Sequence, residues 1–157
     1  MIKAFIIIPA KADSKRLVGK NKRMIAGKTL VEHSIEYVKS SKLAGKVLLS
    51  TEDEETQNIA ESYGVEVVGR TVDYMGEREV ADVYIKIFQE YGDDTFTHVV
   101  GVRTRNGSIR ITKAQYVKDG SMSRRVGSML DDCTNIHSEE DLKQAERNIQ
   151  NNEWIYR

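Results

Sequence analysis

Short apolar runs alternate with amphipathic stretches along most of the chain. Residues 2–8 are almost continuously apolar and rich in β-branched side chains, which is typical of a strand buried on both faces of a parallel sheet. Further runs predict strands at 46–50, 65–68, 97–102 and 108–112. Helical spacing of apolar residues, capping residues or both predict helices at 29–40, between 51 and 64, at 80–91 and at 138–150.

Capping residues mark where several of these helices begin. Thr29 and Thr51 each stand three positions before a glutamate, which is the pattern of a capping box, and Ser138 has an aspartate at the third helical position. The alternation of strands and helices predicts a doubly wound α/β fold with helices on both faces of the sheet and right-handed crossovers. No repeat or linker interrupts the pattern, so we expect residues 1–157 to form a single compact domain.

The composition narrows the classes of partner and compartment. The 157 residues include 24 basic and 24 acidic side chains, which cancel, so no net basic field indicates a nucleic acid or an anionic membrane as partner. The only cysteine, Cys133, cannot form an intramolecular disulfide, which favours a reducing compartment. The apolar stretch before Pro9 is too short for a signal-peptide core or a membrane span. We therefore expect a cytoplasmic protein.

One local feature departs from this neutral balance. Residues 9–23, "PAKADSKRLVGKNKR", contain six Lys or Arg and a single acid directly after the first predicted strand. In an open α/β sheet, ligands bind beyond the carboxyl ends of the strands, and this segment begins there. Several ammonium groups, a hydroxyl and Gly19 suit a set of phosphate oxygens, although no Walker loop and no G-x-G-x-x-G is present. The alternative is a solvated surface loop.

The order of residues in this segment favours the hypothesis of a phosphate-binding site. "IIIPAKADSKRLVGKN" at 6–21 closely resembles the IPAR-G-G-S-K and K-N signature of the CMP-sugar synthetases, above all the acylneuraminate (CMP-sialic acid) cytidylyltransferases. The resemblance continues through 26–70, through "NGSIRI" at 106–111 and through "NIHSEEDLKQAE" at 135–146. It implies a Rossmann-like three-layer α/β/α nucleotidyltransferase fold and the transfer of CMP from CTP to an acidic sugar, with release of pyrophosphate. The sugar would be a sialic acid, another nonulosonate or a Kdo-like acid.

The resemblance also implies roles for individual residues. Lys11 and Lys20 are the implied catalytic cations, which neutralise phosphate charge while a sugar hydroxyl attacks the α-phosphorus. Lys11 stands where the family has an arginine, so it keeps the charge but loses the bidentate fork. The implied nucleotide-binding set is Ala10, Lys11, Ser14, Lys15, Lys20, Asn21 and Arg70. The implied substrate-binding residues are Arg105 and Asn106. Homodimerisation is a weaker implication.

The chain departs from the family pattern in two places. Val102 passes almost directly to the turn at 105–107, so several tens of residues that contribute to the sugar pocket are missing. The resemblance implies Mg²⁺, yet Asn135 and His137 occupy the positions of the family's metal-binding aspartates, and hard cations prefer carboxylates. Asp131 and Asp132 lie nearby and could replace them. Three hypotheses stay open: a compact cytidylyltransferase, a binding protein that has lost turnover, and a chain from which a segment has been removed.

Overall fold

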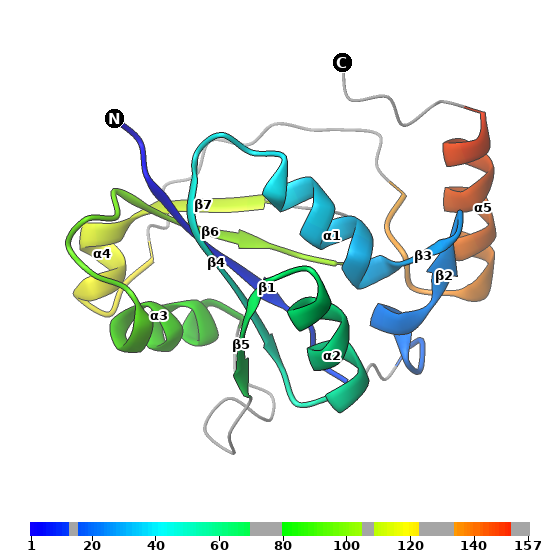
Figure 1. Cartoon of the computed structure of the whole chain (residues 1–157), viewed down its shortest axis with the longest axis horizontal. Coiled ribbons are helices and arrows are strands. Elements are labelled where there is room, and N and C mark those ends of the chain that lie inside the picture. The colour runs from blue at the N-terminus through cyan, green and yellow to red at the C-terminus, as the bar shows by residue number, and fades with distance from the viewer. Residues whose placement is uncertain (13–15, 70–79, 105–108, 123–133, 152–157) are drawn as a thin grey trace.

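A mostly parallel sheet forms the centre of the molecule. The computed structural model describes residues 1–12, 16–69, 80–104, 109–122 and 134–151. Within these residues one five-stranded sheet has the order β5-β4-β1-β6-β7 (Figure 1). Its strands are β1 (Ala4–Pro9), β4 (Ala44–Thr51), β5 (Glu66–Gly69), β6 (His98–Val102) and β7 (Ile109–Lys113). The first four run parallel and β7 runs antiparallel to β6. The predicted fold class is confirmed.

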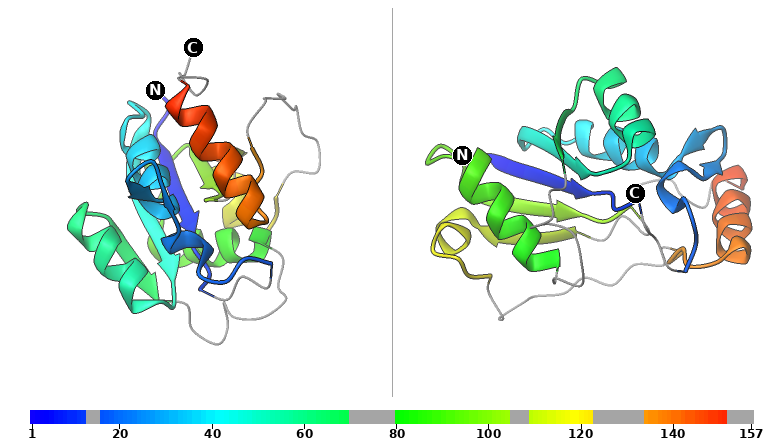
Figure 2. Two further views of the ribbon diagram at one scale, coloured as in Figure 1. Left: turned by 90° about the vertical axis from the view of Figure 1, so that its right-hand side faces the viewer. Right: turned by 90° about the horizontal axis from the view of Figure 1, so that it is seen from below.

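Helices cover both faces of this sheet, as the right-hand view in Figure 2 shows. The helices are α1 (Leu30–Lys39), α2 (Glu54–Ser62), α3 (Val80–Tyr91), α4 (Ala114–Lys118) and α5 (Glu139–Gln150). Side chains of β1 point alternately to the two faces: Phe5 and Ile7 pack in the cluster beneath α3, and Ile6 and Ile8 pack against α1. Because β1 is covered on both sides, its sequence is a continuous apolar run rather than an alternating one.

Two predicted features differ in the structure. The second helix begins two residues later than its capping-box pattern indicated, because Thr51 is fully buried as the last residue of β4. Asp53 caps this helix instead, and its carboxylate accepts hydrogen bonds from the N–H and the hydroxyl of Thr56 at 2.9 and 2.7 Å. The other difference is the antiparallel β6–β7 pair, which has no helix between its strands in the described residues. The capping boxes predicted at Thr29 and Ser138 are confirmed.

A small hairpin that the residue pattern did not predict precedes α1. Its strands, β2 (Met24–Ile25) and β3 (Lys28–Thr29), are antiparallel and only two residues long. The turn between them places Ala26 at φ 48° and Gly27 at φ 82°. A two-residue turn with both φ values positive matches the right-handed twist of the flanking strands, which explains the glycine at its second position.

The hairpin packs against α5, which lies beside it in Figure 1. The Ala26 N–H donates to Glu146 Oε1 at 3.1 Å, and a ring nitrogen of His33 lies 2.8 Å from the Ile25 carbonyl oxygen. A third apolar cluster fills the space between the hairpin, α1 and α5; its buried members are Leu17, Ile25, Leu30, Ile136, Leu142 and Ala145. The last helix is therefore fixed to the segment that follows the basic residues.

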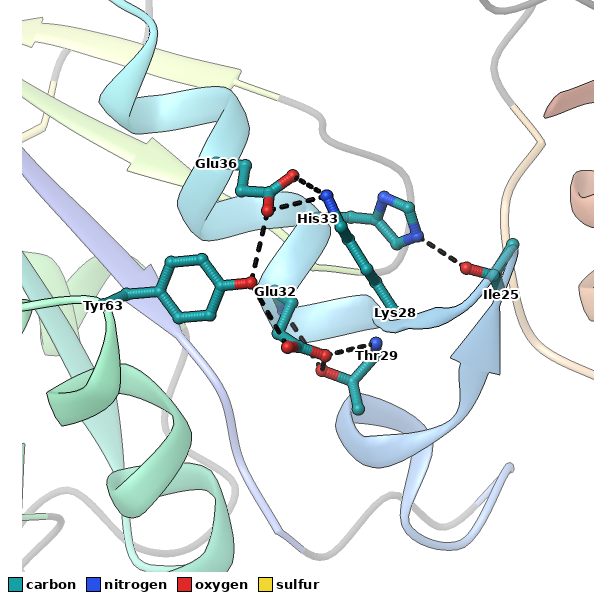
Figure 3. A network of polar contacts seen from close by, with 7 residues as sticks. All are labelled: Ile25, Lys28, Thr29, Glu32, His33, Glu36 and Tyr63. Carbon is teal, nitrogen blue, oxygen red and sulfur yellow. Dashed lines mark hydrogen bonds and ion pairs between the residues drawn. The ribbon is translucent and has the colours of Figure 1, made fainter.

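A polar network joins α1 to the end of α2 and to the hairpin (Figure 3). The Tyr63 hydroxyl lies 3.2 Å from one oxygen of Glu32 and 3.2 Å from one oxygen of Glu36. Hydrogen bonds from the Thr29 N–H and hydroxyl, and then from Tyr63, lower the pKa of Glu32. The Lys28 ammonium, 2.7 Å from Glu36, and Tyr63 lower the pKa of that carboxyl. Burial and the charge of Glu32 raise the pKa of Tyr63 to about 12.

This network makes a pH-dependent contribution to stability. Tyr63→Phe is expected to lower the free energy of unfolding slightly at neutral pH, because the hydroxyl that donates to Glu32 or Glu36 is lost. The pKa of each carboxyl lies below its ordinary value of 4.5 in the folded state, so the contribution is full above that pH and is lost as the pH falls through the lowered values. Urea unfolding should show the difference from wild type shrinking as the pH is lowered below 4.5. An equal loss in Tyr116→Phe, on the exposed side of α4, would contradict this account.

Candidate functional site

The basic segment begins at the carboxyl edge of the sheet. The buried Ala10 donates its N–H to the Ser50 carbonyl at 2.8 Å, which continues the β1–β4 pairing by one residue. Gly19, at φ 63°, then precedes a short 3-10 helix, η1 (Lys20–Lys22). This left-handed conformation is one that glycine adopts without steric cost, so Gly19 has a defined role in the turn. Lys11 and Lys20, the two predicted catalytic cations, are both half-buried.

The segment folds back on itself through Asn21. The Asn21 side chain is only 6% exposed, and its Nδ2 donates to the Lys11 carbonyl at 2.9 Å. Its Oδ1 accepts from the Thr104 hydroxyl at 2.7 Å. Thr104 is 8% exposed and follows β6, so one amide links the start of the basic segment, η1 and the end of a central strand. The structure therefore brings Lys11 and Asn21, ten positions apart, side by side.

A carboxylate from the next strand also contacts the segment. Glu52, directly after β4, accepts the Ala12 N–H on Oε1 at 3.0 Å. Its other oxygen is buried and has no hydrogen-bond partner among the described residues, and the same holds for the Ser50 hydroxyl. Neither Glu52 nor Thr104 was singled out from the sequence. The acidic turn after the second predicted strand was the only available signal for Glu52, and Thr104 had none.

The cations of the segment differ in their surroundings. Lys22 forms ion pairs with Glu55 at 2.9 Å and with Asp53 at 3.1 Å, and these two acids raise the pKa of Lys22. Arg23 forms an ion pair with Glu139 at the start of α5. For Lys11, no ion pair is found within the residues that the structure describes. Lys22 and Arg23 therefore contact acidic side chains of the protein itself, and Lys11 is the cation of the segment that we consider first for binding an anion.

The positions of the expected metal ligands carry a different arrangement. His137 Nδ1 lies 3.4 Å from Arg16 Nη1, and because a guanidinium only donates, this ring nitrogen accepts. Asp141 caps α5: its carboxylate accepts from the N–H groups of His137 and Ser138 and from the Ser138 hydroxyl, each at 2.9 Å, and these bonds lower its pKa. Asn135 is exposed. Among the described residues, no group of three or more His, Cys, Asp or Glu could hold a metal ion.

Other predicted positions lie outside the described residues; these are Ser14, Lys15, Arg70, Arg105, Asn106, Asp131, Asp132 and Cys133. Part of the connection between β6 and β7 also lies outside the described residues. The two strands pair in continuous register, from His98 with Lys113 to Val102 with Ile109. In the described parts of the chain, no helix combines the length and the apolar character needed to cross a bilayer.

Comparison with known proteins identifies the class. A family model described as cytidylyltransferase matches residues 5–154. The chain therefore belongs to the cytidylyltransferase family, and the resemblance found in its motifs is confirmed. It is 41% identical over 61 residues to CMP-N,N'-diacetyllegionaminic acid synthase of Legionella pneumophila, a match that covers 39% of this chain and 26% of that protein. It is 34% identical over 84 residues to N-acylneuraminate cytidylyltransferase of Escherichia coli O18:K1:H7. This match covers 54% of this chain and 20% of that protein.

Solved structures support the fold. The chain superposes with a TM-score of 0.57 on CMP:2-keto-3-deoxy-manno-octonic acid synthetase in complex with CTP, at 21% identity, over 74% of this chain and 45% of that one. A cytidylyltransferase from Leptospira borgpetersenii gives a TM-score of 0.54 at 21% identity, over 75% of this chain and 47% of that one. The chain spans less than half of the length of each of these four proteins.

Proposed function

We propose that this chain forms the nucleotide-binding part of an enzyme that transfers CMP from CTP to an acidic sugar and releases pyrophosphate. The observation that supports this most is the basic segment at the carboxyl edge of β1, folded so that Lys11 lies beside Asn21. Family membership and the names of the relatives, which act on legionaminic, neuraminic and related acids, give the substrate class. The cytoplasmic location stays a prediction, which rests on the single cysteine of the sequence.

In this proposal a hydroxyl of the sugar attacks the α-phosphorus of CTP, a P–O bond to that oxygen forms, and the bond to the pyrophosphate group breaks. The hydroxyl proton leaves to solvent or to the departing phosphate. Lys11 and Lys20 neutralise the charge that spreads over the phosphate oxygens, and positioning together with cations supplies most of the catalysis of such transfers. Ser14, Lys15 and Arg70 would contribute further nucleotide contacts, and Arg105 with Asn106 would contact the sugar.

Mg²⁺ does not fit the residues that replace the family's aspartates. Asn135 supplies a single neutral amide oxygen, and the His137 nitrogen already accepts from the positively charged Arg16, which opposes a second cation there. We therefore base no step of the reaction on a metal at these positions.

A second candidate function is a nucleotide-binding protein without turnover. The Asn135 and His137 replacements favour it, as does the shortened stretch between β6 and β7. The two candidates share the CTP site and differ only in whether pyrophosphate is released.

One experiment separates the two. Purified protein is given CTP, Mg²⁺ and a panel of sialic, legionaminic and Kdo-type acids, and released pyrophosphate is measured together with CTP affinity. Release that depends on one of the sugars is the expected result for the transferase. Binding of CTP with no release for any sugar would show that this chain does not catalyse the transfer by itself and would support the binding protein, and absence of CTP binding would exclude both.

A further inference from the structure

The peptide group between Lys11 and Ala12 is held from both sides, by Asn21 from later in the same segment and by Glu52 from the end of β4. Its carbonyl oxygen accepts from Asn21 Nδ2 at 2.9 Å, and its N–H donates to Glu52 Oε1 at 3.0 Å. Asn21 is in turn oriented by the Thr104 hydroxyl at 2.7 Å. The peptide is therefore held directly by η1 and by the residue after β4, and indirectly, through Asn21, by Thr104 after β6.

The consequence is a fixed direction for the backbone at Lys11. A peptide plane in a loop rotates through ψ of the residue before it and φ of the residue after it, and bonds to both of its polar atoms remove that freedom. Ala10, one residue earlier, is already fixed by its bond to Ser50 and by burial. Lys11 thus leaves the sheet edge from a backbone that is held on both sides. The starting point of its ammonium group is set before any ligand arrives, which lowers the cost of ordering the site on binding.

The amide of Asn21 is used by the protein itself. Its nitrogen and its oxygen each have a protein partner, and the side chain is almost completely buried. The motif resemblance assigned Asn21 to the nucleotide, but these contacts support a role in shaping the loop.

Charge makes the position of Glu52 informative. A carboxylate beside a site for a triphosphate repels the ligand, so a residue with no other role would weaken binding there. Glu52 nevertheless places one oxygen on the Ala12 N–H, and its second oxygen is buried without a partner among the described residues. Such an arrangement costs free energy that the orientation of the loop has to offset.

We propose that Glu52 and Thr104 are positioning residues of the nucleotide site, and that they act with Asn21 by clamping the Lys11–Ala12 peptide. The effect on nucleotide affinity rests on the proposed function, whereas the clamp itself is a property of the free protein. The clamp and its effect on nucleotide affinity can therefore be measured separately.

The clamp is tested by hydrogen exchange of the Ala12 amide, followed by NMR in the absence of nucleotide. Glu52→Ala is expected to speed this exchange by about tenfold or more, because a bond to a charged acceptor is lost, while Glu52→Gln, which keeps an acceptor oxygen, retains most of the protection. Thr104→Val should speed it in the same direction and Thr104→Ser should not. Glu54→Ala, on the same turn but exposed, is the matched control. Unchanged exchange at Ala12 in both Glu52→Ala and Thr104→Val would overturn the proposal.

The effect on nucleotide binding is tested by measuring the CTP affinity of the same variants. The clamp predicts about tenfold weaker binding in Glu52→Ala, with rescue by Glu52→Gln, whereas simple removal of a repulsive charge predicts tighter binding in both. Tighter binding in Glu52→Ala would overturn the positioning role. If Glu52→Ala does not fold, Thr104→Val decides both measurements, since it removes one hydroxyl and keeps the side-chain volume. If the wild-type chain does not bind CTP, the proposed function fails and the exchange at Ala12 still decides the clamp.

Discussion

Lys20→Ala is expected to weaken CTP binding by about ten- to a hundredfold, because charge-assisted hydrogen bonds to phosphate contribute about 1.5–3 kcal/mol each. Lys20 begins η1, immediately after the left-handed Gly19 and beside the Asn21 that contacts Lys11. Isothermal titration calorimetry at fixed salt measures the change. The affinity of the wild type should also fall as salt is raised, since the contact is ionic.

Lys22→Ala is the matched control for this prediction. It removes the same charge from the same short helix, at a residue that the motif does not assign to the nucleotide and that forms ion pairs with Glu55 and Asp53. Its loss should therefore change CTP affinity by less than about threefold, as expected for a cation neutralised by its neighbours. Equal losses for the two variants would show that only the total charge of the segment matters, and would contradict a specific role for Lys20.

Phe88→Ala is expected to lower the free energy of unfolding by about 3–5 kcal/mol, which is the typical cost of a phenylalanine-sized cavity in a core. Phe88 of α3 is 1% exposed, and its ring centroid lies 5.2 Å from that of Phe5 on β1 and 6.5 Å from that of Phe96, in edge-to-face geometry. These three rings join the central strand to the helix beneath it. Urea unfolding gives the value directly.

Phe88→Leu provides the comparison for this cavity. It keeps most of the apolar volume and loses the edge-to-face contacts, so we expect it to cost less than about half as much as Phe88→Ala. A loss below about 1 kcal/mol in Phe88→Ala would contradict the packing described for this face of the sheet, since surface substitutions have effects of that size.

The main strands and helices could be predicted because each leaves a pattern in nearby residues. A strand covered on both faces produced the apolar run at 2–8, and Thr29 and Ser138 carry the hydroxyls that cap their helices. The hairpin formed by β2 and β3 could not be predicted, because strands of two residues show no periodicity. The antiparallel direction of β7 follows from the short connection after β6, because a parallel neighbour needs a crossover of about a dozen residues or more.

The residues of the candidate site likewise differ in whether a local sequence pattern identifies them. Lys11, Lys20 and Asn21 lie within one short motif and were identified from it. Glu52 and Thr104 contact that motif from 40 and 83 positions away, so only the folded chain brings them to it. The replacement of the expected metal ligands was visible in the sequence, but the guanidinium of Arg16 beside His137 was not.

The most direct test of the central claim is a titration of the isotope-labelled chain with CTP, followed through its backbone amide resonances. A nucleotide site formed by the basic segment predicts saturable shifts that concentrate on residues 10–12 and on η1, with the amides of α4, at the opposite edge of the sheet, unchanged. Absence of saturable shifts at millimolar CTP, or shifts that concentrate on α4 instead, would contradict a nucleotide site formed by the basic segment.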